Sequence, residues 1–225
     1  MDTLRDPDLL PRTVDRRDGP HGELVLRRAG EHYEIISNGT FLMDTRNGES
    51  ERLLVRAALD RSAEPGARVL IGGLGVGFSL RCALDHPATG SVTVVELLRA
   101  IVEWHRGPLA AFSGHALDDP RTTVDNRDLL DWLTDSTDGY DAICLDIDNG
   151  PDWTVVPENG SLYDLDATRS LAARLNPGGV LTVWSAADSA EYAARLREVF
   201  TEVTVLPVPV PVGEPDVVFV ARHPR

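Results

Sequence analysis

The sequence predicts an α/β fold in which a mostly parallel sheet follows a short β-hairpin region. From Ala67 onward, apolar runs typical of buried strands alternate with stretches of helical periodicity. Strands that alternate with helices pair in parallel through right-handed crossovers. The last two runs, 202–208 and 215–222, are separated only by a Pro/Gly-rich loop, so they must pair antiparallel.

The chain before Ala67 predicts an arm, three short strands and a helix. Residues 1–20 are polar and charged, and we expect them to form a loose arm. Alternating runs predict strands at 22–28, 32–37 and 40–43, and helical spacing predicts a helix over 51–59.

Five strand–helix units make up the rest of the chain. The predicted strands are 67–73, 91–96, 121–125, 140–147 and 179–186. The predicted helices are 76–85, 97–106, 128–133, 162–175 and 189–200. Five such units closed by an antiparallel C-terminal hairpin predict the Rossmann-like sheet of the class I methyltransferase fold, here with a short N-terminal β-hairpin extension.

Composition excludes several classes of protein. Of the 225 residues, 42% are hydrophobic and 26% are charged, which is a globular balance and not that of a disordered or collagen-like chain. The net charge of −14 argues against nucleic-acid and anionic-membrane partners and suits a cationic ligand. All 22 basic residues are arginine, so no lysine is present for Schiff-base or P-loop chemistry.

The sequence also predicts the compartment. Cys82 and Cys144 lie in apolar runs and are expected to be core thiols of a reducing compartment, not a disulfide framework. The N-terminal residues lack the apolar segment of a secretory signal, and no apolar stretch approaches the roughly 18 residues of a membrane span. We therefore expect a cytoplasmic protein.

A glycine-rich turn, Gly73-x-Gly75-x-Gly77, follows the first parallel strand. Glycine lets the backbone turn sharply and approach a ligand, and the next helix offers free N–H groups. The dinucleotide motif G-x-G-x-x-G does not fit in either register, because Phe78 and Leu80 occupy its last position. The turn therefore favours S-adenosylmethionine over a dinucleotide. The alternative is that the glycines only allow tight packing of strand against helix.

Two acids follow the next strands. Glu96 ends the second strand, where a carboxylate can accept both ribose hydroxyls of a nucleoside; alternatively it is a helix N-terminal acid. Asp128 follows the third strand, where it can accept from the adenine amine, cap a helix, or do both. Together with the glycines, Glu96 predicts an adenosyl site.

Asp146 and Asp148 end the fourth strand, and period-two alternation places both on one side of it. Ligands of open α/β sheets bind beyond the carboxyl ends of the strands. Asp146 is therefore expected to face the sulfonium or its acceptor, where a carboxylate can hold a cationic amine and take its proton. The alternative is a solvated strand-end cap. With no histidine nearby, we expect no metal.

Three segments carry a resemblance to a known family. YDAICLDIDNGP (140–151) is similar to the strand-four motif of the spermidine synthase family of polyamine aminopropyltransferases, which ends in D-S-S-D-P. NGSLYDLD (159–166) resembles the helix start that follows this motif, and NGTFLMDTRNGESER (38–52) resembles the family's gatekeeping segment. The resemblance extends from about residue 38 to 186.

The resemblance implies roles for individual residues. Asp146 matches the family's catalytic acid, Glu96 its ribose-binding acid and Asp128 its adenine-binding acid. Tyr163 falls in the substrate-side aromatic region, and Asp148 lies in the motif that binds the acceptor.

The departures from the family pattern concern the polyamine-specific contacts. Gly75 replaces the acid of the glycine loop, Leu42 replaces a donor-binding glutamine, and Asn149 replaces the second acid of D-S-S-D. A Tyr-His pair on the acceptor side is replaced by Glu51 and Arg52.

Loss of the loop acid leaves room for a carboxylate on the donor, which favours S-adenosylmethionine over its decarboxylated form. Arg46 and Arg52 are candidate partners of that carboxylate, or surface arginines with no ligand. Trp104 and His105 end the second predicted helix; either their segment lines the adenine side or, as we expect, Trp104 packs and His105 is solvated. Trp153 either walls the acceptor site or packs in the core.

These observations predict a transferase that binds S-adenosylmethionine or its decarboxylated form and passes an aminopropyl-type group to a small-molecule amine. A small-molecule methyltransferase and a non-catalytic adenosyl-binding protein are the alternatives. The family resemblance also implies a possible homodimer through the N-terminal hairpins. The expected organisation is an arm over 1–20, a hairpin and gatekeeping segment over 21–62, and an adenosyl-binding domain over 63–225.

Overall fold

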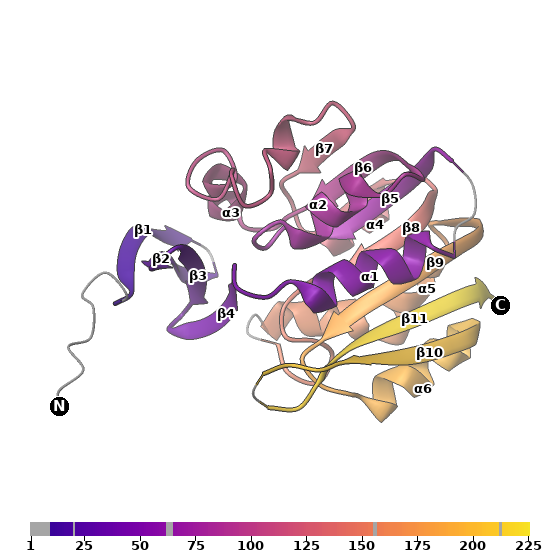
Figure 1. Cartoon of the computed structure of the whole chain (residues 1–225). Coiled ribbons are helices and arrows are strands. Elements are labelled where there is room, and N and C mark those ends of the chain that lie inside the picture. The colour runs from indigo at the N-terminus through magenta and orange to yellow at the C-terminus, as the bar shows by residue number, and fades with distance from the viewer. Residues whose placement is uncertain (1–9, 20, 62–64, 155–156, 212) are drawn as a thin grey trace. The chain divides into compact units, whose positions relative to one another are not determined.

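The computed structural model describes residues 10–19, 21–61, 65–154, 157–211 and 213–225 (Figure 1). The chain divides into two compact units, Met1–Gly48 and Glu49–Arg225. The helix α1 (Glu49–Leu59) packs on strands and a helix of the larger unit, so it belongs there. The division therefore lies before this helix, whereas the sequence placed a boundary after residue 62.

The smaller unit is an antiparallel sheet with strand order β1-β2-β3-β4. Its strands are β1 (Arg12–Gly19), β2 (Gly22–Ala29), β3 (His32–Ser37) and β4 (Thr40–Asp44). Leu24, Val25 and Leu26 of β2 are buried in succession, as is Ile35 of β3, so burial does not follow a simple alternation. The predicted hairpin and the third strand are confirmed.

Strand β1 corrects the expectation of a loose arm. It pairs antiparallel with β2, from Arg12 opposite Arg28 to Gly19 opposite Gly22. Its side chains are almost all exposed, so it lacks the alternating apolar pattern by which a half-buried strand is recognised. Backbone pairing with β2 makes it a strand. Residues 1–9 of the expected arm lie outside the described part of the chain.

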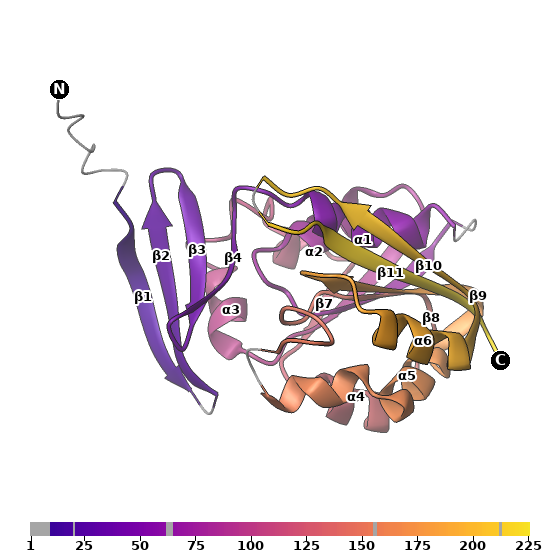
Figure 2. The same cartoon turned by 90° about the horizontal axis from the view of Figure 1, so that it is seen from below.

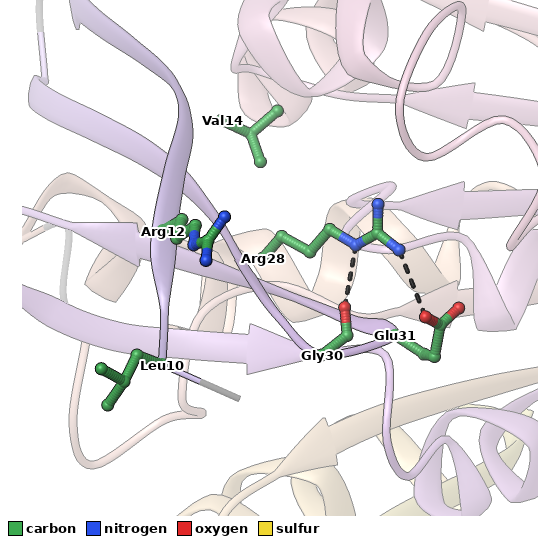
Figure 3. Close-up of a pocket in the computed structure, with 6 residues that line it drawn as sticks. All are labelled: Leu10, Arg12, Val14, Arg28, Gly30 and Glu31. Atoms are coloured by element: carbon green, nitrogen blue, oxygen red, sulfur yellow. Dashed lines mark hydrogen bonds and ion pairs between the residues drawn. The ribbon is translucent and has the colours of Figure 1, made fainter. Parts of the chain in front are cut away.

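A hollow of about 460 Å³ lies on the smaller unit (Figure 3). It is lined by Leu10, Arg12, Val14, Arg28, Gly30 and Glu31. The guanidinium of Arg28 donates to the Gly30 carbonyl at 2.8 Å and to Glu31 at 3.4 Å, so its charge is already paired. None of the residues predicted to bind a ligand lines this hollow.

The larger unit contains a seven-stranded sheet of order β10-β11-β9-β8-β5-β6-β7. The strands are β5 (Ala67–Gly72), β6 (Thr89–Val95), β7 (Thr122–Asp125), β8 (Tyr140–Leu145), β9 (Leu175–Ser185), β10 (Phe200–Val208) and β11 (Asp216–Pro224). β5 to β9 pair in parallel, and β11 pairs antiparallel with both β9 and β10. The mostly parallel sheet with its antiparallel C-terminal hairpin confirms the predicted fold class.

Helices cover both faces of this sheet, α1 and α2 on one and α4, α5 and α6 on the other (Figure 2). Besides α1, they are α2 (Phe78–Asp85), α3 (Arg99–Trp104), α4 (Leu129–Asp135), α5 (Leu165–Ala172) and α6 (Ala190–Val199), with the 3-10 helices η2 (Ala116–Asp118) and η3 (Pro157–Tyr163). The core between sheet and helices includes Ile143, Leu181 and Phe219, none of which is exposed. The order of β8, β5 and β6 brings the carboxyl ends of these three strands to one edge.

Candidate active site

The glycine turn joins β5 to α2, and all three of its predicted glycines have positive φ. The angles are 88° at Gly73, 49° at Gly75 and 90° at Gly77, a region that residues with a Cβ rarely adopt. A Cβ on Gly73 would lie 2.2 Å from the Asp146 carbonyl oxygen, and the Asp146 N–H donates to Gly72 at 2.8 Å. The turn and Asp146 are therefore in direct backbone contact.

Glu96, directly after β6, also contacts the glycine turn, as Asp146 does after β8. Its carboxylate accepts from the Leu74 N–H at 2.7 Å through Oε2 and from the Leu98 N–H at 2.6 Å through Oε1. Burial raises the pKa of Glu96, and its bonds from backbone amides oppose that rise. The Gly75 amide also hydrogen-bonds the carboxylate, and the lone pair that remains can accept a ribose hydroxyl. The ribose role remains a prediction.

Asp128 is the N-cap of α4. Its Oδ1 accepts from the N–H groups of Leu130 at 2.7 Å and Asp131 at 3.2 Å, which establishes the capping role. The adenine role of Asp128 remains a prediction. The neighbouring Asn126 donates to the Glu96 carbonyl at 2.6 Å, and this bond ties the ends of β7 and β6 together.

Asp146 follows β8 and is partly buried. The Ser79 hydroxyl, in the first turn of α2, donates to its Oδ2 at 2.7 Å. Burial raises the pKa of Asp146 to about 6, the charge of Glu96 adds to this rise, and the bond from Ser79 opposes it. The site therefore holds a carboxylate that takes up a proton more readily than an exposed aspartate does.

Glu51 of α1 is a second carboxylate of this site. Burial raises its pKa to about 7, and the charge of Asp146 adds to the rise. The Ser50 hydroxyl lies 2.9 Å from Glu51 Oε2 and 2.8 Å from Asp216 Oδ2. A hydroxyl has one proton to donate, so both contacts are hydrogen bonds only when one of these two carboxyl groups is protonated. Ser50 thus links Glu51 to Asp216 when one of these two carboxyl groups is protonated.

The structure corrects the placement of Asp148. Strand β8 ends at Leu145, and Asp148 has a φ of 56°, so strand alternation does not place it beside Asp146. Its Oδ1 accepts from the Asn149 N–H and its Oδ2 from the Asn159 side chain, both at 2.9 Å. Asp148 shapes the loop after β8, and its contact with a substrate, like that of Asn149, remains a prediction.

Tyr163 also differs from its expected place. Its side chain is 1% exposed in the core, and its hydroxyl donates to the Ile147 carbonyl at 2.6 Å. Burial leaves no face of the ring for a substrate. Tyr163 instead holds the loop after β8 through its hydrogen bond to Ile147. Trp153 of the same loop is 59% exposed, which excludes the alternative that it packs in the core.

The two candidate arginines lie in different units. Arg46 belongs to the smaller unit, where Nη2 lies 2.8 Å from Glu34 and Nη1 pairs with Asp44. These carboxylates raise the pKa of Arg46 and pair its charge. In the larger unit, the Arg52 guanidinium lies 4.6 Å from the centre of the Phe78 ring. A role for either in binding a donor carboxylate remains a prediction.

His105 is the clearest difference from the sequence expectation in this region. It was expected to be solvated, but it is 2% exposed, and its Nε2 lies 2.9 Å from the Gly75 carbonyl oxygen. Trp104 is buried, as expected. Ser79 and Glu51 were also not predicted to act at the site. The hydrogen bond of Ser79 to Asp146 and the effect of the Asp146 charge on Glu51 join residues far apart in sequence, which no local pattern reveals.

Other predicted features concern metals, thiols and membranes. Within the described ranges, no group of three potential metal-binding His, Cys, Asp or Glu side chains comes together. Cys82 and Cys144 are free thiols, and Cys144 is buried. None of the described helices has both the length and the apolar character needed to cross a membrane.

Comparison with known proteins identifies the family. A model of the spermine/spermidine synthase domain matches residues 51–217, which is most of the larger unit. The chain belongs to the spermine/spermidine synthase family. Within this family it is 30% identical over 167 residues to a polyamine aminopropyltransferase 2 of Ralstonia nicotianae and 31% identical over 173 residues to a polyamine aminopropyltransferase of Mycobacterium tuberculosis.

These family members are much longer than this chain. The matches cover 73% and 74% of this chain but 32% of the Ralstonia protein and 31% of the Mycobacterium protein. A polyamine aminopropyltransferase 2 of Pseudomonas aeruginosa is 34% identical over 67% of this chain and 44% of its own length. The chain thus spans about a third of the first two relatives.

Solved structures support the fold of this family member. The spermidine synthase of Thermotoga maritima aligns with a TM-score of 0.76 at 17% identity, over 94% of this chain and 72% of that protein. Human methyltransferase-like protein 13, in complex with SAH, aligns with a TM-score of 0.57 at 20% identity, over 77% and 79% of the two chains. These similarities confirm a methyltransferase-like fold.

Proposed function

We propose that this chain is an aminopropyl-type transferase that binds an adenosyl sulfonium and a small-molecule amine. The observation that carries the proposal is the contact of Asp146 with the glycine turn, where the carboxyl ends of β5 and β8 meet. The family and its relatives named polyamine aminopropyltransferases support the reaction type. The donor is decarboxylated S-adenosylmethionine, as in that family, or S-adenosylmethionine itself.

The residues of the site fit such a donor. Gly73, Gly75 and Gly77 let the turn take the positive φ angles that bring it close to Asp146 and His105, and Glu96 offers a lone pair to the ribose. The donor supplies a carbon activated by its bond to positively charged sulfur. In-line displacement forms the N–C bond and breaks the C–S bond, whose electron pair stays on the departing thioether.

Asp146 has two tasks in this reaction. Its charge attracts the ammonium form of the acceptor, and its carboxylate takes the proton that the nitrogen must lose, since an amine with a pKa of about 10 is otherwise protonated at neutral pH. The raised pKa of Asp146, about 6, makes it a better proton acceptor than an ordinary aspartate. Alignment of nitrogen, carbon and sulfur can supply roughly 7–11 kcal/mol in the best cases.

The test is to identify the nucleoside that remains after reaction. The purified protein is incubated with S-adenosylmethionine or its decarboxylated form and a panel of di- and polyamines, with Asp146→Asn as the control. We expect methylthioadenosine from the wild type and at least a hundredfold less from the variant. S-adenosylhomocysteine instead would establish methyl transfer, for which S-adenosylmethionine, the donor favoured by the missing loop acid at Gly75, would be the substrate. Adenosyl binding without product would establish a non-catalytic protein.

The assembly and compartment are also proposals. A homodimer is consistent with the family resemblance, and sedimentation velocity across a concentration series tests it. A cytoplasmic location is proposed from the free thiols and is tested by cell fractionation.

A further inference from the structure

His105 lies in the interior of the larger unit, directly after α3. Its backbone N–H donates to the Ile101 carbonyl at 3.1 Å, and 2% of its surface is exposed. A polar ring in such a place must have partners for both nitrogens, because a buried polar atom without a hydrogen bond is costly. The proposed reaction uses Asp146 and does not involve this ring.

The contacts of His105 fix its tautomer. Nε2 lies 2.9 Å from the Gly75 carbonyl oxygen, which can only accept, so Nε2 carries the proton. Nδ1 lies 3.3 Å from the Ser113 hydroxyl, which also reaches the Ala110 carbonyl at 3.2 Å. In the neutral ring the proton is therefore on Nε2, and Nδ1 accepts from Ser113 when the single proton of that hydroxyl is not donated to the Ala110 carbonyl.

The ring also fills the space against the glycine turn. A Cβ on Gly77 would lie 2.7 Å from His105 Cε1 and 2.7 Å from the Cβ of Ser113. The Gly75 carbonyl is held by His105, and the Leu74 N–H is held by Glu96. Two hydrogen bonds therefore fix the turn. One comes from His105, directly after α3, and the other from Glu96, directly after β6.

The charge state of the ring matters for a cationic ligand. Burial lowers the pKa of His105, and its bond to the Gly75 carbonyl opposes that change. A neutral imidazole holds the turn without adding a positive charge next to the bound sulfonium. Arginine or lysine could donate the same bond but would repel such a ligand.

We propose that His105 is a positioning residue of the donor site, which fixes the Gly75 carbonyl through Nε2–H and keeps the turn from Gly73 to Gly77 shaped for an adenosyl group. This role rests on the proposed function, because it requires that an adenosyl donor binds at the turn. His105 does not touch the reacting atoms and acts only through the backbone of the turn.

Three variants test the proposal, with methylthioadenosine as the calorimetric probe. His105→Leu removes the N–H group that bonds the Gly75 carbonyl but keeps a side chain that fills space. His105→Gln keeps an N–H group at similar reach. His115→Asn, at an exposed histidine, is the control. We expect the Leu variant to bind methylthioadenosine about tenfold more weakly, because the buried Gly75 carbonyl is then left without its hydrogen-bond partner. The Gln variant should stay within about threefold of wild type, and the control should be unchanged.

The outcomes separate the two proposals. Wild-type protein that does not bind methylthioadenosine overturns the proposed function and with it this role. If the wild type and the Leu variant bind methylthioadenosine with equal affinity, the role of His105 alone is overturned. The same holds if the Gln variant binds as weakly as the Leu variant, because the loss of packing would then explain the weaker binding of both variants.

A measurement on the wild type covers the case in which His105→Leu does not fold. Nitrogen-15 NMR of labelled histidine, assigned with His105→Gln, reports the ring tautomer. We expect a neutral ring with its proton on Nε2 between pH 6 and 8, and resonances that shift when methylthioadenosine is added. A proton on Nδ1, a charged ring at pH 7, or resonances that do not shift when methylthioadenosine is added would overturn the proposal.

Discussion

Ser79 and Asp146 show how one hydroxyl sets the character of the proposed base. The Ser79 hydroxyl donates to Asp146 at 2.7 Å and stabilises the ionised carboxylate, whose pKa burial raises to about 6. Sequence could point to Asp146, because an acid after a buried strand is a local signal. It could not point to Ser79, because the fold alone brings α2 against the end of β8.

Ser79→Ala is expected to raise the pKa of Asp146 further, by about 1–2 pH units, since a hydrogen bond to a charged group contributes about 1.5–3 kcal/mol. Carbon-13 NMR of the side-chain carboxyl groups, assigned with Asp146→Asn, measures this shift. Ser170→Ala, on the exposed face of α5, is the control. An unchanged titration of Asp146 in Ser79→Ala would show that the hydroxyl does not tune the carboxylate.

Glu51 predicts a pH dependence of stability. Its pKa is raised from 4.5 to about 7 in the folded chain, so the folded state binds more protons than the unfolded state between these values. The stability linked to Glu51 is therefore present below about pH 4.5 and is lost as the pH rises toward 7. Glu51→Gln cannot ionise, so the variant should gain on the order of 1–3 kcal/mol relative to wild type between pH 4.5 and pH 8.

Urea unfolding of both proteins at the two pH values measures this difference. Glu49→Gln, at an exposed acid of the same helix, is the control. If wild type and Glu51→Gln lose stability in parallel from pH 4.5 to pH 8, the carboxyl group of Glu51 is not the group that titrates.

At the scale of the elements, the turn between β5 and α2 depends on the backbone of Gly73. Gly73→Ala places a Cβ 2.2 Å from the Asp146 carbonyl and forces alanine to a φ of 88°. We expect the variant to lose about 2 kcal/mol or more of folding stability and to bind methylthioadenosine weakly, because left-handed backbone alone costs about 1–2 kcal/mol. Gly160→Ala, which has open space around it, is the control.

Thermal unfolding and calorimetry measure both effects. If Gly73→Ala is as stable as Gly160→Ala and binds methylthioadenosine as tightly, the close approach of the turn to β8 is not a constraint.

The elements that sequence predicted are those in which burial produces a periodic pattern. Strands β5, β8, β9 and β11 were recognisable because buried strands are nearly continuous apolar runs. Strand β1 was not, because its side chains are exposed, and the start of β9 at Leu175 was hidden by the Asn-Pro-Gly-Gly that follows. Asp148 was misplaced because a left-handed turn ended the alternation of β8.

At the scale of the whole molecule, the larger unit brings together residues that sequence could only name separately. The glycine turn, Glu96 and Asp146 were each predicted from a local motif, and their contact follows from the strand order. The burial of His105 was missed because its hydrogen bond to Gly75 joins residues 30 positions apart. The polar residues around it in the sequence give no sign that its side chain is buried. Local signals therefore predicted which residues meet at this site, and tertiary packing decided which neighbours support them.

The division of the chain predicts which fragment folds. Leu54, Val55 and Leu59 of α1 are at most 1% exposed and lie on a helix that packs against β8, β9 and α2. Burying each stabilises by about 1.5–3 kcal/mol, so together they contribute roughly 5–9 kcal/mol, which is comparable to the entire stability of a typical domain. A fragment that starts at residue 63, the boundary expected from sequence, loses all three.

We therefore expect residues 49–225 to unfold cooperatively near the midpoint of the whole chain and residues 63–225 to be insoluble or to lack a cooperative transition. Circular dichroism during heating distinguishes these outcomes. A Leu54→Ala variant of the whole chain is an intermediate case and should lose about 2–5 kcal/mol, because the cavity left by a buried leucine adds to the lost burial. Cooperative unfolding of 63–225 at an unchanged midpoint would show that α1 is dispensable and that the boundary lies after it.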